Sequence, residues 1–153
     1  MHRGLATQRS VCDLFRRAGL LVEDDITVRI PRSGIVEQID GVVELDGRRY
    51  LLEVRDHSVP LSAEELAWPI LKARSRAGVG LILVSASGYT RPAVEYCQGA
   101  LRELAVVLVH LDELVALRDP EGELPDLLRA KVHAAELYRD PYLRADGWTG
   151  SGS

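Results

Sequence analysis

Four polar residues stand in two segments that otherwise have the pattern of β-strands. Gln38 and Asp40 lie two residues apart in the first segment, and Glu53 and Arg55 lie two residues apart in the second. Because successive side chains of a strand point to opposite faces, each pair shares one face of its strand. Burying an unpaired charge is expensive, so Glu53 and Arg55, in an otherwise apolar strand, need each other, a metal ion or a cleft.

The dipeptide Asp46-Gly47 is a strong hairpin signal, and a hairpin there brings Asp40 near Glu53. Two carboxylates held together suit Mg²⁺, which takes one or two protein carboxylates plus water and substrate phosphate. Such an ion polarises a phosphodiester and lowers the pKa of its bound water. The simpler interpretation of the same residues is an aspartate that shapes a turn before Gly41 and a salt bridge within one strand.

Hydrophobic periodicity, capping residues and turn residues predict the elements that position these side chains. Pro69 is expected to kink or re-nucleate the second of the predicted helices. An antiparallel hairpin followed by crossover units implies an α/β fold with a mixed sheet and helices on both faces. The predicted helices cover residues 5–18, 62–76, 91–101, 112–118 and 124–138, and the predicted strands cover 25–30, 35–45, 49–55, 78–86 and 104–110.

The composition is that of one ordinary globular domain. The chain has 153 residues, of which 46% are hydrophobic and 27% are charged. We expect a single domain over residues 1–145 and a flexible, linker-like tail over 146–153. Cys12 and Cys97 lie in apolar stretches and are expected to be buried and free. With no secretory signal evident and no apolar run long enough for a membrane span, a soluble cytoplasmic protein is expected.

The order of these segments resembles the PD-(D/E)xK nuclease superfamily, specifically its Mrr-like restriction-endonuclease branch. The Ile-Asp-Gly at 39–41 corresponds to the family's Asp-Gly after a strand, and the Tyr-Leu-Leu-Glu-Val-Arg at 50–55 corresponds to its strand ending in Glu-x-Lys. Residues 60–66 and 80–90 resemble the family's next helix start, strand and turn. The resemblance covers roughly residues 5–109 and implies a restriction-endonuclease-like three-layer α-β-α fold. It also implies a DNA endonuclease that depends on Mg²⁺ (or Mn²⁺), in restriction or anti-phage defence.

The resemblance also implies roles for individual residues. Asp40 and Glu53 would be metal ligands, with the carbonyl of Val54 as a third. Arg55 stands where the family has a lysine that orients the attacking water and steadies the phosphate. An arginine can hold a phosphate as a planar fork, but it keeps its proton and cannot act as a base. Gln8 matches a supporting glutamate of the family's first helix, without the negative charge.

Three further groups of residues are candidates for the same site. Lys72, on the following helix, falls where related sequences keep a basic residue and would replace the missing lysine. It also lies off the apolar stripe of that helix, which favours a solvated side chain. Gln38 is a further polar candidate beside Asp40. Contacts to DNA phosphates, which give affinity without sequence information, are expected from Arg32, Arg48, Arg49, Arg74 and Arg76.

The charge balance bears on the partners. The chain has 19 Lys+Arg and 23 Asp+Glu, a formal net charge of −4, which predicts weak and strongly salt-dependent non-specific binding of DNA. We therefore expect a fused or separate recognition partner, and cleavage of both strands would suggest a homodimer. Because Gln8 and Arg55 depart from the family pattern, a catalytically degenerate fold that binds nucleic acid or protein remains an alternative. A third alternative is a structural module that docks through its Leu-rich C-terminal helix.

Overall fold

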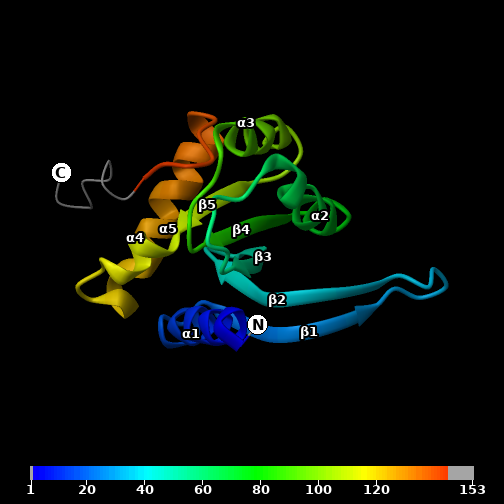
Figure 1. Cartoon of the computed structure of the whole chain (residues 1–153), viewed down its shortest axis with the longest axis horizontal. Coiled ribbons are helices and arrows are strands. Elements are labelled where there is room, and N and C mark those ends of the chain that lie inside the picture. The colour runs from blue at the N-terminus through cyan, green and yellow to red at the C-terminus, as the bar shows by residue number, and fades with distance from the viewer. Residues whose placement is uncertain (1, 145–153) are drawn as a thin grey trace.

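The computed structural model describes residues 2–144 as a five-stranded sheet between two layers of helices (Figure 1). The strand order β1-β2-β3-β4-β5 follows the chain; β2 is antiparallel to both its neighbours, whereas β3, β4 and β5 are parallel. The predicted α/β fold with a mixed sheet is confirmed. The strands are β1 (Leu21–Arg29), β2 (Val36–Leu45), β3 (Arg48–Arg55), β4 (Val79–Ser85) and β5 (Val106–His110), and the helices are α1 (His2–Arg17), α2 (Ala63–Arg74), α3 (Arg91–Ala100), α4 (Leu111–Val115) and α5 (Pro120–Leu137).

The sheet buries apolar side chains on both faces. On one face, Phe15 and Leu128 of α1 and α5 pack against Leu52. On the other, Ile70 of α2 belongs to the same cluster as Leu51. Strands β4 and β5 are covered on both faces, which is why they are continuous apolar runs rather than alternating ones.

Local chemistry explains where several elements begin and end. The hairpin turn has φ of 53° at Asp46 and 80° at Gly47, the positive pair that a two-residue turn of this kind requires. The prediction for the last helix was wrong in its start: α5 begins at Pro120, because the Asp119 side chain accepts a hydrogen bond from the Gly122 amide. Helix α2 continues through Pro69, so the predicted re-nucleation does not occur.

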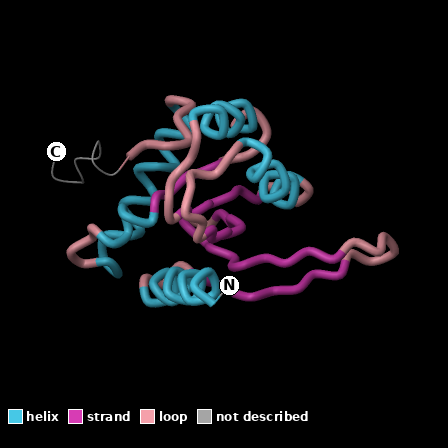
Figure 2. The backbone as a smooth tube through the Cα atoms, in the orientation of Figure 1, coloured by secondary structure: helices cyan, strands magenta, loops and turns pink. Residues whose placement is uncertain are grey.

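The first strand is longer than predicted, and this lengthens the β1–β2 hairpin. Strand β1 starts at Leu21 and pairs with β2 up to Val36, whereas the pairing of β2 with β3 starts only at Gly41. The ribbon formed by β1 and β2 therefore leaves the body of the sheet and projects beyond it (Figures 1 and 2). Asp40 lies where β2 separates from β3.

Some expectations concern single residues or the ends of the chain. Cys12 and Cys97 are buried and free, as predicted. Across residues 2–144, no helix has the combination of length and apolarity needed to cross a membrane. The predicted tail at 146–153 lies outside the described residues.

Candidate functional site

Asp40, Glu53, Arg55 and Lys72 meet where β2 and β3 diverge beneath α2. Leu51 packs with the apolar side of α2, and Glu53, two residues further along β3, reaches Lys72 on the same helix. Asp40 and Glu53 are only 8% and 1% exposed. The structure thus gathers two carboxylates and two cations from three elements into one buried cluster.

Lys72 is buried, so the preference for a solvated side chain was wrong. It is 3% exposed, and its Nζ donates to Glu53 Oε1 at 2.9 Å and to the carbonyl of Gln38 at 2.6 Å. Helix α2 lies across the diverging ends of β2 and β3. Lys72 lies off the apolar stripe of α2, but its ammonium therefore contacts a carboxylate and a strand carbonyl instead of water.

The guanidinium of Arg55 contacts one oxygen of each group that the resemblance assigns to a metal. It donates to Glu53 Oε1 at 3.1 Å and to the Val54 carbonyl at 3.1 Å, and it lies 3.5 Å from Asp40 Oδ2. Three oxygens from two strands therefore converge on one cation. The Arg55 side chain is 27% exposed, so part of it faces solvent.

This set of oxygens fits a hard divalent cation. Two carboxylates and one carbonyl are the ligands that Mg²⁺ accepts, with water completing its octahedron. Across residues 2–144, no group of three or more His, Cys, Asp and Glu side chains is arranged to hold a metal ion. A structural zinc site, which needs four protein ligands, is therefore not formed by the described side chains.

Asp40 is held by its neighbours on β3 and α1. Its Oδ2 accepts a 2.8 Å hydrogen bond from the Val54 amide, and its carbonyl accepts one from the Cys12 thiol at 3.6 Å. Burial raises the pKa of Asp40, and the Glu53 charge raises it further. The hydrogen bond from Val54 and the charges of Arg55 and Lys72 act in the opposite direction but do not reverse the shift.

The raised pKa predicts that Asp40→Asn stabilises the protein increasingly as the pH rises. The folded protein holds the Asp40 proton more tightly than the unfolded chain does. Wild type therefore loses stability as the pH rises from the unfolded pKa, about 3.9, through the folded value. Asparagine keeps an acceptor for the Val54 amide and carries no charge. Urea unfolding of both proteins between about pH 3 and pH 7 measures the difference, and a difference that does not change with pH would contradict the prediction.

Of the two candidate glutamines, Gln38 does not bring its side chain to the site. Gln38 turns towards β1, where its amide bonds Thr27 and Asp25, each at 2.9 Å, and only its backbone carbonyl reaches Lys72. Gln8 lies on α1 and is half-buried. Among the contacts of residues 2–144, no hydrogen bond joins Gln8 to Asp40 or Glu53.

The five arginines predicted to contact DNA do not line the site together. Arg48 and Arg49 lie at the far end of β3 from Glu53, and Arg32 lies at the tip of the β1–β2 ribbon. Within residues 2–144, four of these five arginines, all but Arg32, are partly neutralised by an acidic side chain. The ion pairs join Arg48 to Glu136, Arg49 to Glu44, Arg74 to Glu103 and Arg76 to Glu37.

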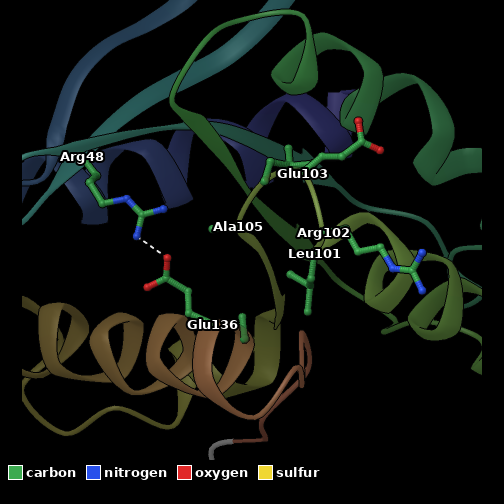
Figure 3. Close-up of a pocket in the computed structure, with 8 residues that line it drawn as sticks. Arg48, Leu101, Arg102, Glu103, Ala105 and Glu136 are labelled. Carbon is green, nitrogen blue, oxygen red and sulfur yellow. Dashed lines mark hydrogen bonds and ion pairs between the residues drawn. The ribbon is translucent and has the colours of Figure 1, made fainter.

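A surface hollow lies at this same far end of the strands. Figure 3 shows Arg48 and Glu136 paired across it, with Glu103 and Ala105 on its wall and Arg102 pointing away. The hollow contains none of the residues of the cluster around Glu53, so it is separate from the candidate site.

Both lysines of the chain lie in buried ion pairs, and only Lys72 is a site candidate from the sequence. All but two of the 19 basic residues are arginine, and the exceptions are Lys72 and Lys131. Both are buried and each is paired with a buried glutamate, Glu53 and Glu113 respectively. Nothing in the sequence pattern pointed to the thiol of Cys12 as a partner of Asp40.

Comparison with known proteins supports the fold alone. No protein-family model matches the chain, and no curated protein matches it. The fold is similar to the crystal structure of AF1548, described as a protein of unknown function, with a TM-score of 0.51 and 19% sequence identity. The similarity covers 81% of this chain and 76% of that chain. This chain is therefore similar to AF1548 in having a mixed five-stranded sheet flanked by helices.

Proposed function

We propose that this domain is a divalent-metal-dependent DNA endonuclease of the PD-(D/E)xK type, with a restriction-endonuclease-like, Mrr-like fold. The observation that carries the proposal is the convergence of three oxygens on one cation. These are the carboxylates of Asp40 and Glu53 and the carbonyl of Val54, all in contact with the Arg55 guanidinium. The residues that the family resemblance assigns to metal binding are thus preorganised around a positive charge.

In this proposal each residue of the cluster has a separate task. Asp40, Glu53 and the Val54 carbonyl hold Mg²⁺ or Mn²⁺. When bound, the ion polarises the phosphodiester and lowers the pKa of the water that attacks it. Lys72 orients Glu53 through its 2.9 Å bond and supplies the ammonium that the family carries at the end of the strand. Arg55 turns outwards and binds phosphate oxygens as a planar fork.

The proposed substrate is DNA, in a cytoplasmic restriction or defence reaction. With a formal net charge of −4, the domain is expected to bind DNA weakly by itself. Tight binding would then require the metal ion or a fused or separate, more basic recognition partner. A homodimer would present two sites to the two strands of one duplex.

The test is to incubate the purified protein with supercoiled plasmid and Mg²⁺ or Mn²⁺. We expect nicking that requires the metal and stops on addition of EDTA. Nicking that persists in EDTA would overturn the metal-dependent mechanism. Binding of the plasmid without nicking, under every metal condition, would favour a nuclease fold that binds nucleic acid without cutting it.

The same guanidinium contact also supports this non-cutting alternative, because Arg55 could be a permanent substitute for the ion. The two functions differ in whether wild type itself binds the metal: in a nuclease the ion displaces Arg55, whereas a permanent substitute keeps the ion out of wild type. We expect Arg55→Ala to bind Mn²⁺ about tenfold more tightly than wild type, since it removes a competing charge-assisted interaction worth about 1.4 kcal/mol. Electron paramagnetic resonance titration of free Mn²⁺ measures both affinities.

A matched control is Arg49→Ala, which removes an arginine from the same strand at its opposite end, where it pairs with Glu44. Its Mn²⁺ affinity should equal that of wild type. If neither wild type nor Arg55→Ala binds Mn²⁺, the assignment of a metal to Asp40 and Glu53 fails.

A further inference from the structure

The β1–β2 ribbon carries a surface that the proposed site does not use. It projects beyond the body of the sheet, and its turn is the outermost part (Figures 1 and 2). Residues 26–36 contain Arg29 and Arg32 and no acidic residue, although the whole chain has a net charge of −4. The far end of the ribbon is therefore a local concentration of positive charge.

These two positive charges are available to a partner. Arg29 and Arg32 are exposed, and within the described part of the chain neither forms an ion pair with an acidic side chain. Arg48 and Arg76, by contrast, are engaged by Glu136 and by Glu37. A guanidinium that is already paired with a carboxylate offers less net attraction to a phosphate than the unpaired guanidiniums of the ribbon.

The turn presents Arg32 in a fixed but unfavourable conformation. Its φ is 64°, in the left-handed region where glycine is unstrained and a residue with a Cβ is not. The turn is closed by a 2.9 Å bond from the Ile30 amide to the Ile35 carbonyl. Ser33 Oγ reinforces it, donating to the Ile30 carbonyl and accepting from the Ile35 amide, both at 3.0 Å. Beside it, Ile35 and Val36 are about half exposed.

We propose that the tip of this ribbon, residues 29–36, binds the major groove of duplex DNA, with Arg29 and Arg32 on phosphates. The proposal rests on the proposed nuclease function, because it assigns the ribbon to the same substrate. A two-stranded ribbon fits a major groove about 12 Å wide. The opposite charges of arginine and phosphate supply the affinity.

The position of the ribbon relative to Asp40 sets where on the duplex it would bind. About five residues of extended chain, 35–39, separate Asp40 from the turn, roughly 17 Å at about 3.4 Å per residue. Because base pairs of B-DNA are about 3.4 Å apart, a ribbon that runs along the duplex would place its tip roughly five base pairs from a phosphate held at Asp40. The ribbon would thus add contacts away from the scissile bond.

The test compares wild type with the double variant Arg29→Ala/Arg32→Gly. Glycine suits the positive φ, so the change removes charge without adding strain. The probe is a labelled DNA duplex of about 30 base pairs, longer than the ribbon's reach, in EDTA to prevent cleavage, with binding followed by fluorescence anisotropy at several salt concentrations. We expect roughly tenfold weaker binding and a salt slope reduced by about 2, near 0.9 for each phosphate that the variant no longer neutralises.

The matched control is Arg139→Gly. Arg139 is also exposed and also has a positive φ, 58°, but it follows α5 rather than lying on the ribbon. It should leave both affinity and salt slope unchanged. The ribbon variant should bind double-stranded RNA of the same sequence as tightly as wild type does. The narrow major groove of A-form RNA does not admit a ribbon, so the ribbon makes no contact there that the variant could lose.

Three results would overturn the proposal. One is a double variant with wild-type affinity and salt slope, another is an equal loss in Arg139→Gly, and the third is a wild-type protein that does not bind the duplex. A change of sedimentation behaviour without a change of salt slope would assign the ribbon to a second copy of the chain instead. Failure of this proposal can be told apart from failure of the nuclease proposal. Binding that depends on the ribbon, without cleavage, would refute only the nuclease function. Cleavage that the ribbon variant leaves unchanged would refute only the role of the ribbon.

Discussion

Asp40→Asn is expected to abolish metal-dependent nicking of plasmid DNA while the protein stays folded. Removing one charged ligand takes away a preorganised electrostatic interaction with the ion, and such changes lower rates by about 10²–10³-fold. The fold survives because asparagine still accepts the hydrogen bond from the Val54 amide. It also relieves the like-charge repulsion from Glu53 that raises the pKa of Asp40. Nicking rates measured with purified protein and Mg²⁺ test this, with circular dichroism to establish folding.

The control is Asp46→Asn, an aspartate in the β2–β3 turn at the other end of the same hairpin. Asp46 pairs with Arg129, and asparagine tolerates its positive φ. Asp46→Asn should cut DNA like wild type. Glu53→Gln should be as inactive as Asp40→Asn but less stable, because it leaves the buried ammonium of Lys72 without its charge partner. Nicking that survives in both Asp40→Asn and Glu53→Gln would refute the site.

Lys72→Met is expected to lower the stability of the protein by about 3 kcal/mol while leaving it folded. It leaves the buried carboxylate of Glu53 with Arg55 as its remaining cation. Breaking a buried pair costs about 3–5 kcal/mol, and Arg55 places this case near the lower end. A loss of about 3 kcal/mol should lower Tm by roughly 6–12 °C in a chain of this size. Urea and thermal unfolding measure it directly.

Cleavage distinguishes a functional lysine from one that only stabilises the fold. Lys131 is a control for the loss of a buried lysine, because it is 1% exposed and pairs with buried Glu113. Its Nζ lies 3.0 Å from Glu113 Oε1, close to the 2.9 Å between Lys72 Nζ and Glu53 Oε1. Both methionine variants should be less stable. At a temperature where both are folded, only Lys72→Met should lose nicking activity. Equal activities in the two variants would reduce Lys72 to a structural role.

The residues of the hairpin allowed its part of the site to be predicted. Asp46 and Gly47 favour a tight turn, and the period of two along each strand assigns faces. Together they bring Asp40 close to Glu53 and Arg55, because in a hairpin neighbours in space are also neighbours in sequence. Local signals of this kind also predicted the capping box of α2 and the burial of β4 and β5.

Only the tertiary structure decided the surroundings of that hairpin. Lys72 belongs to a helix whose sequence pattern favours a solvated lysine, yet α2 packs across the divergence of β2 and β3 and buries it against Glu53. The ion pairs that occupy Arg48 and Arg76 likewise join segments far apart in the chain. Turn and strand preferences act between near neighbours, whereas the packing of α2 and the length of the free ribbon depend on how the whole sheet is covered. The sequence by itself therefore determined the two carboxylates, and the fold determined the cations that surround them.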